Sequence, residues 1–352
     1  MTDFAAYNAT THPIIRKEDD YNSILDHAFE KSASYILRKN GSYYEIINGS
    51  TGKISYGGSG NVGGATGTVF ADVIQACINA NYSEGIMLFL KPETYYVTKT
   101  IFLRGRILMQ GAGMGATELY LNNDVNDNMF EWDTANDTEY FTQIQDMELD
   151  GNNANNATNG KALCIPTAAG KRLSDLHIFR LYVHHFREVA VEVDYGWGVM
   201  LDNNIIEFNT GMGGDLAGNS MRITNNRFLE NYYGAQISGG NNIISNNMFY
   251  RSDRHGLVIL GAAYGNTITG NQILENSQEH ANWYDGLWLS NSNNTTVVGN
   301  AFDGGSQERY GLKLDATAVK CVVIGNGFKN GSYGTDYYLD NGTNTVIDHN
   351  AT

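Results

Sequence analysis

The amino-acid sequence predicts an all-β solenoid, a parallel β-helix, on three observations. Its composition is typical of a turn-rich β protein, with 40 glycines, 22 tyrosines and only 3 prolines among 352 residues. From about residue 199 onward a segment with paired asparagines recurs, as in RITNNRFLEN and IISNNMFYRS. A second short segment, usually opened by glycine, follows each copy, as in GAQIS and GLWLS. Strand-like repeats of this kind indicate coils that stack on one another.

The second asparagine of each copy marks the repeat, at steps of 22, 21, 24, 29, 26 and 24 residues. These residues are Asn204, Asn226, Asn247, Asn271, Asn300, Asn326 and Asn350. Asparagine tolerates the left-handed backbone conformation that tight corners need, and its amide can hydrogen-bond from coil to coil. We therefore assign the asparagines a structural role and leave them out of the candidate site.

An apolar residue two positions after most of these asparagines is expected to point into the coil. We predict one buried column made of Ile206, Phe228, Phe249, Ile273, Phe302 and Phe328. Weaker copies upstream place Ile178, Leu181 and Val183 in one coil and Ile144, Met147 and Leu149 in an earlier one. The solenoid is therefore expected to extend well before residue 199.

The N-terminal part of the chain is predicted to differ from the coils. Residues 68–80 carry apolar residues at helical spacing on one side, which predicts a helix that caps the open apolar end of the stack. Residues 34–66 have the turns and alternation of a small β-hairpin with a Gly-rich loop, and residues 67–352 form the β-helix. Residues 1–33 are interpreted as a linker or assembly segment, which leaves a homo-oligomer open.

Charge and cysteine content exclude several classes of partner. A net charge of −15 repels nucleic acid and anionic membranes, and the absence of an apolar run of about 18 residues argues against membrane insertion. The three cysteines, Cys77, Cys164 and Cys321, lie far apart, so we expect buried thiols rather than disulfides or metal ligands. Asn-x-Ser/Thr sequons point to the cell exterior, although the chain as given lacks the apolar core of a signal peptide.

The segment FADVIQACINANYSEGIMLFLKPETYYVTKTIFLRGRILMQGAGMGATELYL combines a capping helix, a strand ending in Lys-Pro, a second strand and the turn QGAGMG. With the asparagine-marked coils that follow, it resembles the pectate-lyase-like right-handed β-helix superfamily over roughly residues 67–352. That superfamily includes polysaccharide lyases, polygalacturonase-type hydrolases, uronate epimerases, phage tailspikes and non-catalytic surface proteins. The resemblance therefore implies the fold and leaves the function open.

The glycine-led segments are expected to form one sheet whose outward side chains line up as columns. Their register predicts a first column of Glu192, Gly213, Gln236, Val258, Trp288, Lys313 and Tyr338. It predicts a second column of Asp194, Asp215, Ser238, Leu260, Ser290, Asp315 and Asp340. The loops that enter this sheet add Tyr232, Tyr233, Arg254, His255, Tyr284, Asp285, Arg309 and Tyr310.

This face is predicted to bind a glycan in a groove, because aromatic rings stack on sugars while carboxylates and amides bond to hydroxyls. The longest repeat step contains ENSQEHANWYDGLWLS, residues 275–290, which is expected to stand as a wall beside the sheet. The predicted substrate-binding residues are Tyr233, Gln236, Trp283, Tyr284, Trp288 and Tyr310.

Two catalytic arrangements fit the acidic residues of this face. Asp194 and Asp215 on neighbouring coils would place their carboxylates about 5 Å apart, as in retaining glycosidases. With Glu192 they would equally suit Ca²⁺. The resemblance to polyuronate lyases implies such an ion together with an arginine or lysine base, here Arg254 or Lys313. Two further catalytic candidates, His255 and Asp285, directly precede strand glycines.

The leading hypothesis is an extracellular or virion-associated β-helix that binds a polysaccharide and cleaves it as a lyase or a glycoside hydrolase. The usual motif set of polygalacturonases is missing, since YDGLWLS and RHGL match it only in part. The alternative is a non-catalytic glycan-binding adhesin or structural surface protein.

Overall fold

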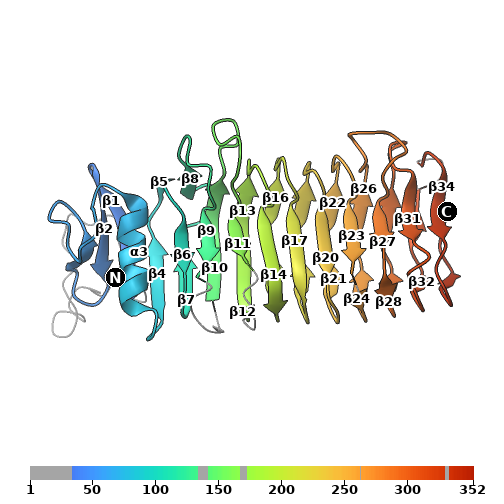
Figure 1. Cartoon of the computed structure of the whole chain (residues 1–352), viewed down its shortest axis with the longest axis horizontal. Coiled ribbons are helices and arrows are strands. Elements are labelled where there is room, and N and C mark those ends of the chain that lie inside the picture. Colours follow the sequence, from blue (N-terminus) through green and yellow to red (C-terminus); the bar gives the residue numbers. More distant parts are fainter. Residues whose placement is uncertain (1–33, 134–141, 167–172, 262, 330–332) are drawn as a thin grey trace, which may run out of the picture.

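The computed structural model describes residues 34–133, 142–166, 173–261, 263–329 and 333–352. These residues form one rod of stacked coils, with the N-terminal elements at one end and the C-terminus at the other (Figure 1). The strands are parallel throughout the coils, so the predicted parallel β-helix is confirmed. The predicted segment 1–33 lies outside the described residues.

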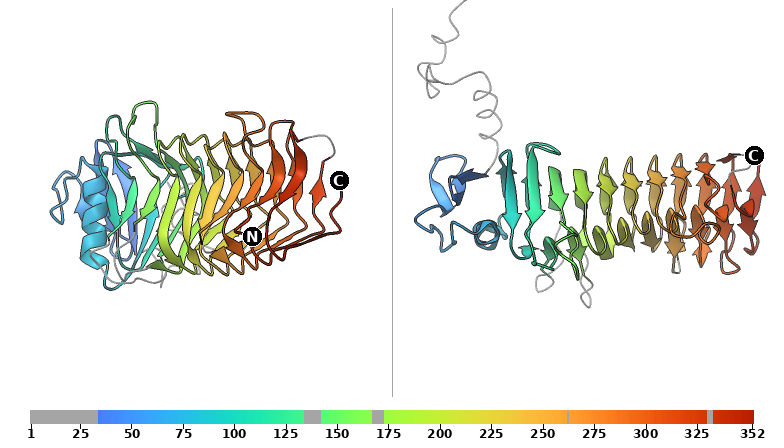
Figure 2. Two further views of the ribbon diagram at one scale, coloured as in Figure 1. Left: turned by 45° about the vertical axis from the view of Figure 1, so that its right-hand side comes forward. Right: turned by 90° about the horizontal axis from the view of Figure 1, so that it is seen from above.

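Two long sheets make up the walls of the rod (Figure 2). Sheet B has 11 strands and contributes one to most coils. It consists of β6 (Ile101–Leu103), β9 (Phe130–Trp132), β11 (Leu163–Ile165), β12 (Leu173–Ser174), β14 (Val191–Trp197), β17 (Gly214–Asn219), β20 (Ala235–Ser238), β23 (Leu257–Leu260), β27 (Leu287–Leu289), β31 (Tyr310–Leu314) and β34 (Asp336–Asp340).

Sheet A has 22 strands and contributes two to most coils, one on each side of an asparagine corner. Its strands are β1 (Tyr35–Asn40), β2 (Tyr43–Asn48), β3 (Ile54–Gly57), β4 (Ile86–Leu90), β5 (Glu93–Val97), β7 (Ile107–Gln110), β8 (Thr117–Leu121), β10 (Thr142–Asp150), β13 (Leu176–His184), β15 (Met200–Asp202), β16 (Ile205–Glu207), β18 (Arg222–Thr224), β19 (Arg227–Leu229), β21 (Ile243–Ser245), β22 (Met248–Tyr250), β25 (Thr267–Thr269), β26 (Gln272–Leu274), β29 (Thr296–Val298), β30 (Ala301–Asp303), β32 (Val322–Ile324), β33 (Gly327–Phe328) and β35 (Val346–Asp348). Two short strands, β24 (Ala263–Tyr264) and β28 (Ser292–Asn293), pair separately.

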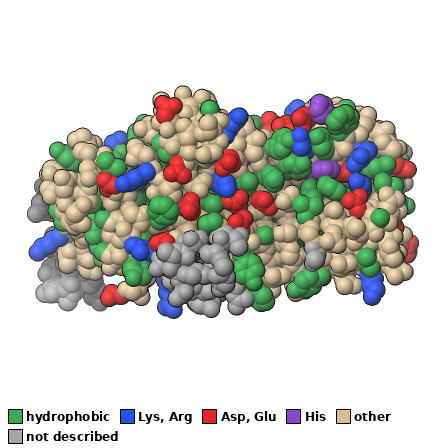
Figure 3. All heavy atoms as spheres, in the orientation of Figure 1, with side chains coloured by type: hydrophobic (Ala, Val, Ile, Leu, Met, Phe, Trp, Pro, Cys, Tyr) green, Lys and Arg blue, Asp and Glu red, His purple; other side chains and the backbone are tan. Residues whose placement is uncertain are grey.

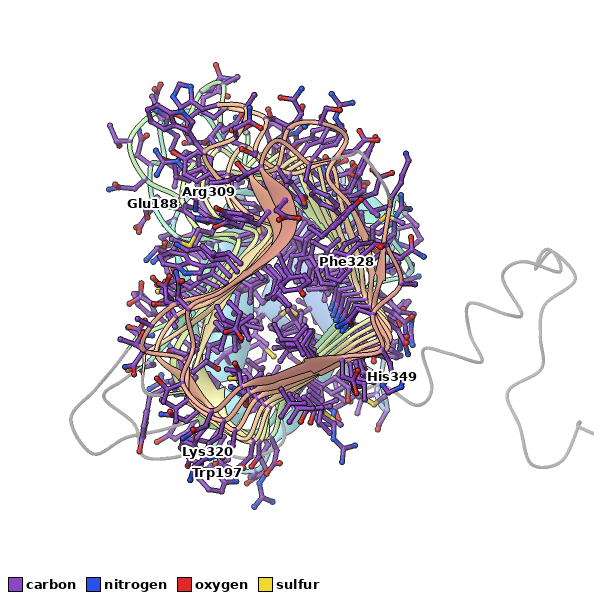
Figure 4. The ribbon with its side chains drawn as sticks, turned by 90° about the vertical axis from the view of Figure 1, so that its right-hand side faces the viewer. Glu188, Trp197, Arg309, Lys320, Phe328 and His349 are labelled. Carbon is purple, nitrogen blue, oxygen red and sulfur yellow. The ribbon has the colours of Figure 1, made fainter. Side chains whose placement is uncertain are left out.

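The predicted apolar column is confirmed. Phe228 and Phe249 stack with ring centroids 5.1 Å apart, and Phe302 and Phe328 stack at 4.7 Å. Ile273 joins the two pairs, because it lies in register between Phe249 and Phe302. All of these side chains are buried, and Figure 4 shows Phe328 pointing into the interior of the coil. Apolar side chains stacked in this way exclude water from the interior of the coils.

The repeated asparagines hydrogen-bond from coil to coil as predicted, and this stack is here called the asparagine ladder. The backbone conformation of the corner differs from the prediction. The main-chain N–H and the side-chain Nδ2 of Asn226 both donate to Oδ1 of Asn247, and Nδ2 donates again to the carbonyl of Leu201. The left-handed backbone belongs to the residue before each ladder asparagine, such as Asn225 (φ 59°) and Asn246 (φ 57°). The ladder asparagines were therefore wrongly expected to take this conformation; they are present because their buried amides are fully hydrogen-bonded.

A second ladder runs along another corner and ends on an acid. Asn209 donates to Asn231, and Asn276 donates through its N–H and its Nδ2 to Oε1 of Glu308. The Glu308 side chain is fully buried, and burial raises its pKa well above the ordinary value, which favours the neutral acid. Its other oxygen has no hydrogen-bond partner among the described residues.

The N-terminal end is closed as predicted, by α3 (Phe70–Asn81). Its apolar side packs on the first coils with Phe70, Val73, Ile74 and Cys77 buried. The predicted hairpin is present as β1 and β2, which continue antiparallel into β3. Strand β1 also pairs in parallel with β4, so the hairpin extends sheet A. Cys77, Cys164 and Cys321 are free and buried, as predicted.

Candidate functional site

The outward face of sheet B carries the predicted site residues, and its register corrects their order. The observed first column is Glu192, Asp215, Gln236, Val258, Trp288, Lys313 and Leu339. Gly213 was wrongly placed in it, because Gly214 rather than Gly213 pairs with Ala235. Gly213 is the corner glycine equivalent to Gly234, and a side chain there would clash with the carbonyl of Gly234 at 2.5 Å. The predicted register of this glycine-rich strand was therefore wrong by two residues.

Three further positions differ from the predicted register, one on the same strand and two on β34. Asp215 lies opposite Glu192, in the first column and not the second. At the C-terminal end, Tyr338 pairs with Leu312 and Asp340 with Leu314, so neither continues its predicted column. Val258 is in register but only 1% exposed, so it offers no open surface.

Glu192, Asp194 and Asp215, here called the acidic group, influence one another at the middle of this face. Burial raises the pKa of Asp215, a hydrogen bond from Gln236 Nε2 at 3.2 Å opposes this, and the charges of Glu192 and Asp194 raise the pKa further. Glu192 is already engaged, since Oε2 lies 2.5 Å from Lys161 Nζ and accepts from Cys164 Sγ at 3.0 Å. Figure 3 shows acidic side chains gathered over the middle of the rod.

The acidic group does not form the compact set of ligands that the Ca²⁺ prediction requires. Among the described residues, one set of three has ligand atoms that all lie within 4.8 Å of one another, and it is Asp150, His184 and His185. The Lys161 ammonium on Glu192 also competes with any cation at this carboxylate. Ca²⁺ binding at the acidic group would require its side chains to move.

His255 lies at the centre of an aromatic cluster with Tyr233, Tyr284 and Trp288. Its ring centroid is 5.0 Å from Trp288, 5.2 Å from Tyr284 and 5.8 Å from Tyr233. The main-chain N–H of Asp285 donates to His255 Nδ1 at 2.9 Å. Because an N–H can only donate, Nδ1 carries a lone pair and the ring proton is on Nε2. Burial and nearby cations lower the pKa of His255 to about 3, so the ring is neutral.

Asp285 is fully buried beneath this cluster. Arg309 donates Nε to Oδ1 at 2.9 Å and Nη2 to Oδ2 at 2.8 Å, a bidentate pair. Burial raises the pKa of Asp285, and the Arg309 guanidinium opposes the shift. Neither carboxylate oxygen is open to a ligand at the surface. The structure therefore gives Asp285 a positioning role. Its carboxylate holds the loop through Arg309, and its main-chain N–H holds the His255 ring.

Trp288 projects outward from β27 as predicted and is half-buried. Its indole Nε1 donates to Asp315 Oδ2 at 2.9 Å, and Lys313 Nζ lies 4.9 Å from the ring centroid. Lys313 also pairs with Asp315 Oδ1 at 3.1 Å. The ring is therefore fixed on the rigid sheet by a cation and a carboxylate from the next coil.

Arg254 lies among tyrosines and does not have the character of a base. Its guanidinium carbon is 4.3 Å from the Tyr232 ring centroid and 5.2 Å from that of Tyr284, and Nε donates to Glu279 Oε2 at 2.8 Å. Burial alone would lower the pKa of Arg254, but hydrogen bonds to Tyr233 and Glu279 outweigh it and raise the pKa. Loss of its proton is therefore harder than in water, which disfavours the lyase role.

The stretch 275–290 forms a short excursion held by hydrogen bonds. The N–H groups of Gln278 and Glu279 donate to the previous coil, and that of Asn282 donates to Gln307 in the next. Trp283 is 63% exposed and lies 4.6 Å from the His280 ring. The role of this stretch as a wall of the groove stays a prediction.

The structure adds Lys161, which the sequence analysis did not name, and shows that Arg309, named there only as a loop residue, pairs with the buried Asp285. A signal for Arg309 was available, because Tyr232, Arg254, Tyr284 and Arg309 each stand two residues before a corner glycine. That alternation of rings and guanidiniums predicts a stacked column. Tyr310 lies beside it, with the Arg309 guanidinium 5.3 Å from its ring centroid. Figure 3 shows histidines among cationic and hydrophobic side chains here, and Figure 4 shows Arg309 at an outer corner.

Depressions also occur on sheet A, away from these residues. One depression of about 310 Å³ is lined by residues in and beside β16, β19, β22 and β26. Another of about 420 Å³ lies at the C-terminal end of the rod, where Phe328 and Thr352 line it. Neither includes a predicted site residue. We base the site on side-chain chemistry, since an extended ligand can lie along an open sheet.

The chain folds as a right-handed parallel β-helix, and residues 189–351 match the family model described as a right-handed β-helix region. The A-module of mannuronan C-5 epimerase AlgE6 from Azotobacter vinelandii is similar, with 19% identity, a TM-score of 0.51, and coverage of 80% of this chain and 96% of that one. No curated protein matches the sequence. No helix in the described part of the chain is long and apolar enough to cross a membrane.

Two other solved structures are similar. The enzymatically active domain of tailspike protein 2 from bacteriophage CBA120 shares 15% identity at a TM-score of 0.63, over 89% of this chain and 49% of that one. DFA-IIIase from Arthrobacter chlorophenolicus A6, in complex with GF2, shares 13% identity at a TM-score of 0.58, over 80% and 94%. At these identities the likeness establishes the fold alone.

Proposed function

We propose that the outward face of sheet B binds a polysaccharide that lies along the axis of the rod. The carrying observation is the aromatic cluster of Tyr233, His255, Tyr284 and Trp288, which forms where neighbouring coils enter sheet B and is bordered by charged groups. A sugar ring stacks on the face of an aromatic ring, and the Arg254 guanidinium supplies donors to its hydroxyls. His255 is buried and supports the rings from within the cluster. Polysaccharide-acting proteins among the similar structures support this class of ligand.

The bound chain would extend from the aromatic cluster to the acidic group. Trp288 and Asp215 are separated by three steps of the column, through Val258 and Gln236. At about 4.8 Å a step this is roughly 14 Å, a span that several linked sugars cover. Gln236 lies between the two regions, and its amide hydrogen-bonds to Asp215.

We assign cleavage to the acidic group, by hydrolysis. Asp215 has a raised pKa and acts as the acid that protonates the glycosidic oxygen as the bond breaks. Glu192 pairs with Asp215 across neighbouring strands, which lie about 4.8 Å apart and so allow the short carboxylate separation of retaining enzymes, and it serves as the carboxylate that forms the bond to the sugar carbon. Water then releases the sugar, with Asp215 taking the proton. Lys161 keeps a positive charge beside Glu192.

The second candidate function is binding without cleavage, and a specific observation favours it. Glu192 is engaged by Lys161 and Cys164, and Asp285 is buried on Arg309, so these carboxylates already serve the structure.

Under either function we place the protein outside the cell or on a virion, a proposal that similarity to phage tailspikes supports.

The test is incubation with a glycan panel, with reducing ends measured for hydrolysis and ultraviolet absorbance for unsaturated lyase products. Hydrolysis predicts reducing ends that Asp215→Asn abolishes while binding persists. Asp303→Asn, which removes a surface acid elsewhere, serves as the matched control and leaves product formation unchanged. Binding without either product would establish the second function. Unsaturated products would overturn the hydrolytic assignment, and absence of binding to any glycan would overturn both.

A further inference from the structure

The ends of two neighbouring strands of sheet A bring together a second group of polar side chains, on a different wall of the rod from the aromatic cluster. Strands β10 and β13 pair in parallel, with Asp150 in register with His184. His185 follows directly and has a left-handed backbone (φ 56°), which turns the chain at that point. Asp150, His184 and His185 are here called the histidine cluster. They take no part in the proposed glycan site.

The ligand atoms of the histidine cluster face one another. Nδ1 of His184 lies 2.8 Å from Nδ1 of His185, and Oδ1 of Asp150 lies 3.9 Å from the first and 3.6 Å from the second. Two ligands about 2.1 Å from a tetrahedral Zn²⁺ are separated by about 3.4 Å, and these distances fall on both sides of that value. The His185 ring, whose side chain is 46% exposed, can turn to lengthen its short contact with His184, and a small movement of the Asp150 carboxylate shortens the 3.9 Å separation.

The tautomer of His184 is arranged to leave a lone pair for a ligand. Its Nε2 lies 2.9 Å from Glu148 Oε1, so this nitrogen carries the proton and donates to the carboxylate. Nδ1 is then the acceptor and points at His185 and Asp150. A carboxylate on the distal nitrogen is the usual arrangement that orients a metal-bound histidine and increases its basicity. The Tyr182 ring, 4.2 Å from that of His184, holds it from the other side.

We propose that the histidine cluster binds a divalent first-row transition metal ion, for which Zn²⁺ is the test ligand. Two imidazole nitrogens and one carboxylate oxygen match the preference of such ions, whereas Ca²⁺ prefers an all-oxygen set. The proton that His185 Nδ1 shares with His184 in the free protein moves to His185 Nε2 when the metal binds. Water completes the fourth position, reached through the exposed His185 side.

Equilibrium dialysis of the full chain against Zn²⁺, with any polyhistidine tag removed, tests the proposal. One ion per chain is expected to bind, and to raise the melting temperature of the parent by linkage. His185→Ala changes an exposed side chain, so it should stay folded and lose at least tenfold in affinity. Glu148→Gln, which keeps the shape but weakens the bond to His184, should lose about 10- to 100-fold.

The matched control is His177→Ala, on the same strand β13 but outside the cluster, which should bind as the parent does. A parent that binds no Zn²⁺ at 100 micromolar or so would overturn the proposal and leave the cluster structural. His185→Ala binding as tightly as the parent would also overturn it. In a parallel dialysis, Ca²⁺ bound equally by the parent and by His185→Ala would show a carboxylate site instead, which contradicts the proposal.

Discussion

The main-chain N–H of Asp285 donates to Nδ1 of His255 across two neighbouring coils, at 2.9 Å. This one bond determines that His255 presents an N–H and not a lone pair at Nε2, in the middle of the aromatic cluster. Asp285 reaches His255 only because its own carboxylate is anchored by Arg309. The chemistry that a ligand meets on this face is thus determined one layer below the surface.

The buried ion pair is expected to be essential for stability. Arg309→Ala leaves the fully buried Asp285 carboxylate without its cation, which should lower the free energy of unfolding by about 3–5 kcal/mol. Asp285→Asn combined with Arg309→Gln should recover part of this loss, because no uncompensated charge remains. Urea denaturation of the two single variants and the double variant measures the coupling. Strictly additive losses would contradict a direct pair.

The neutral state of His255 predicts a pH-dependent stability. Its pKa in the folded protein, about 3, lies below the ordinary value of 6.5, so the unfolded chain binds a proton more readily. The contribution of His255 is therefore complete above pH 6.5 and is lost as the pH falls from 6.5 towards 3. A loss on the order of a few kcal/mol is expected over that window.

The measurement is the free energy of unfolding of the parent and of His255→Gln at several pH values between 7 and 4. The variant should show a shallower decline than the parent. His280→Ala, which removes an exposed histidine from the same stretch, should decline as the parent does. Equal slopes for the parent and His255→Gln would exclude a neutral His255 as the cause.

The role of Trp288 in glycan binding is tested by its removal. Trp288→Ala should weaken binding by roughly 1–3 kcal/mol, the scale of a central aromatic contact. It should also cost about 1 kcal/mol of stability, because the ring contacts His255 and donates to Asp315. Trp288→Phe should retain more of the binding than Trp288→Ala. Trp283→Ala removes the exposed ring of the stretch 275–290 and tests whether this ring contacts the glycan. Full binding by a folded Trp288→Ala would place the ligand elsewhere.

The aromatic column predicts a large effect of truncation in the core. Phe249→Ala removes a fully buried ring that stacks on Phe228, so it should cost about 3–5 kcal/mol through lost burial and a cavity. Phe208→Ala, at an exposed position with a left-handed backbone, serves as the control and should cost little. Thermal unfolding monitored by circular dichroism compares the two. Similar losses for the two variants would contradict burial of the Phe249 ring as the source of its effect.

Much of the architecture could be predicted from sequence because each coil repeats the same local choices. The stacked phenylalanines and the paired asparagine amides were confirmed, because each depends on neighbours one repeat away. The amphipathic helix before the coils was also confirmed. The outward position of Trp288 followed from strand alternation alone. Such features depend on periodicity, which a single sequence displays.

Tertiary structure alone decided the register and the depth of individual groups. The corner at Gly213 depends on its contact with Gly234 in the next coil, so the register of this glycine-rich strand could not be read from the sequence pattern. The sequence placed Asp285 at the surface, whereas the structure buries it against Arg309. Asp150 lies beside His184 because strands β10 and β13 pair in register at that position. Local chemistry thus determined that this chain coils, while contacts between coils determined which of its polar groups face water and which face one another.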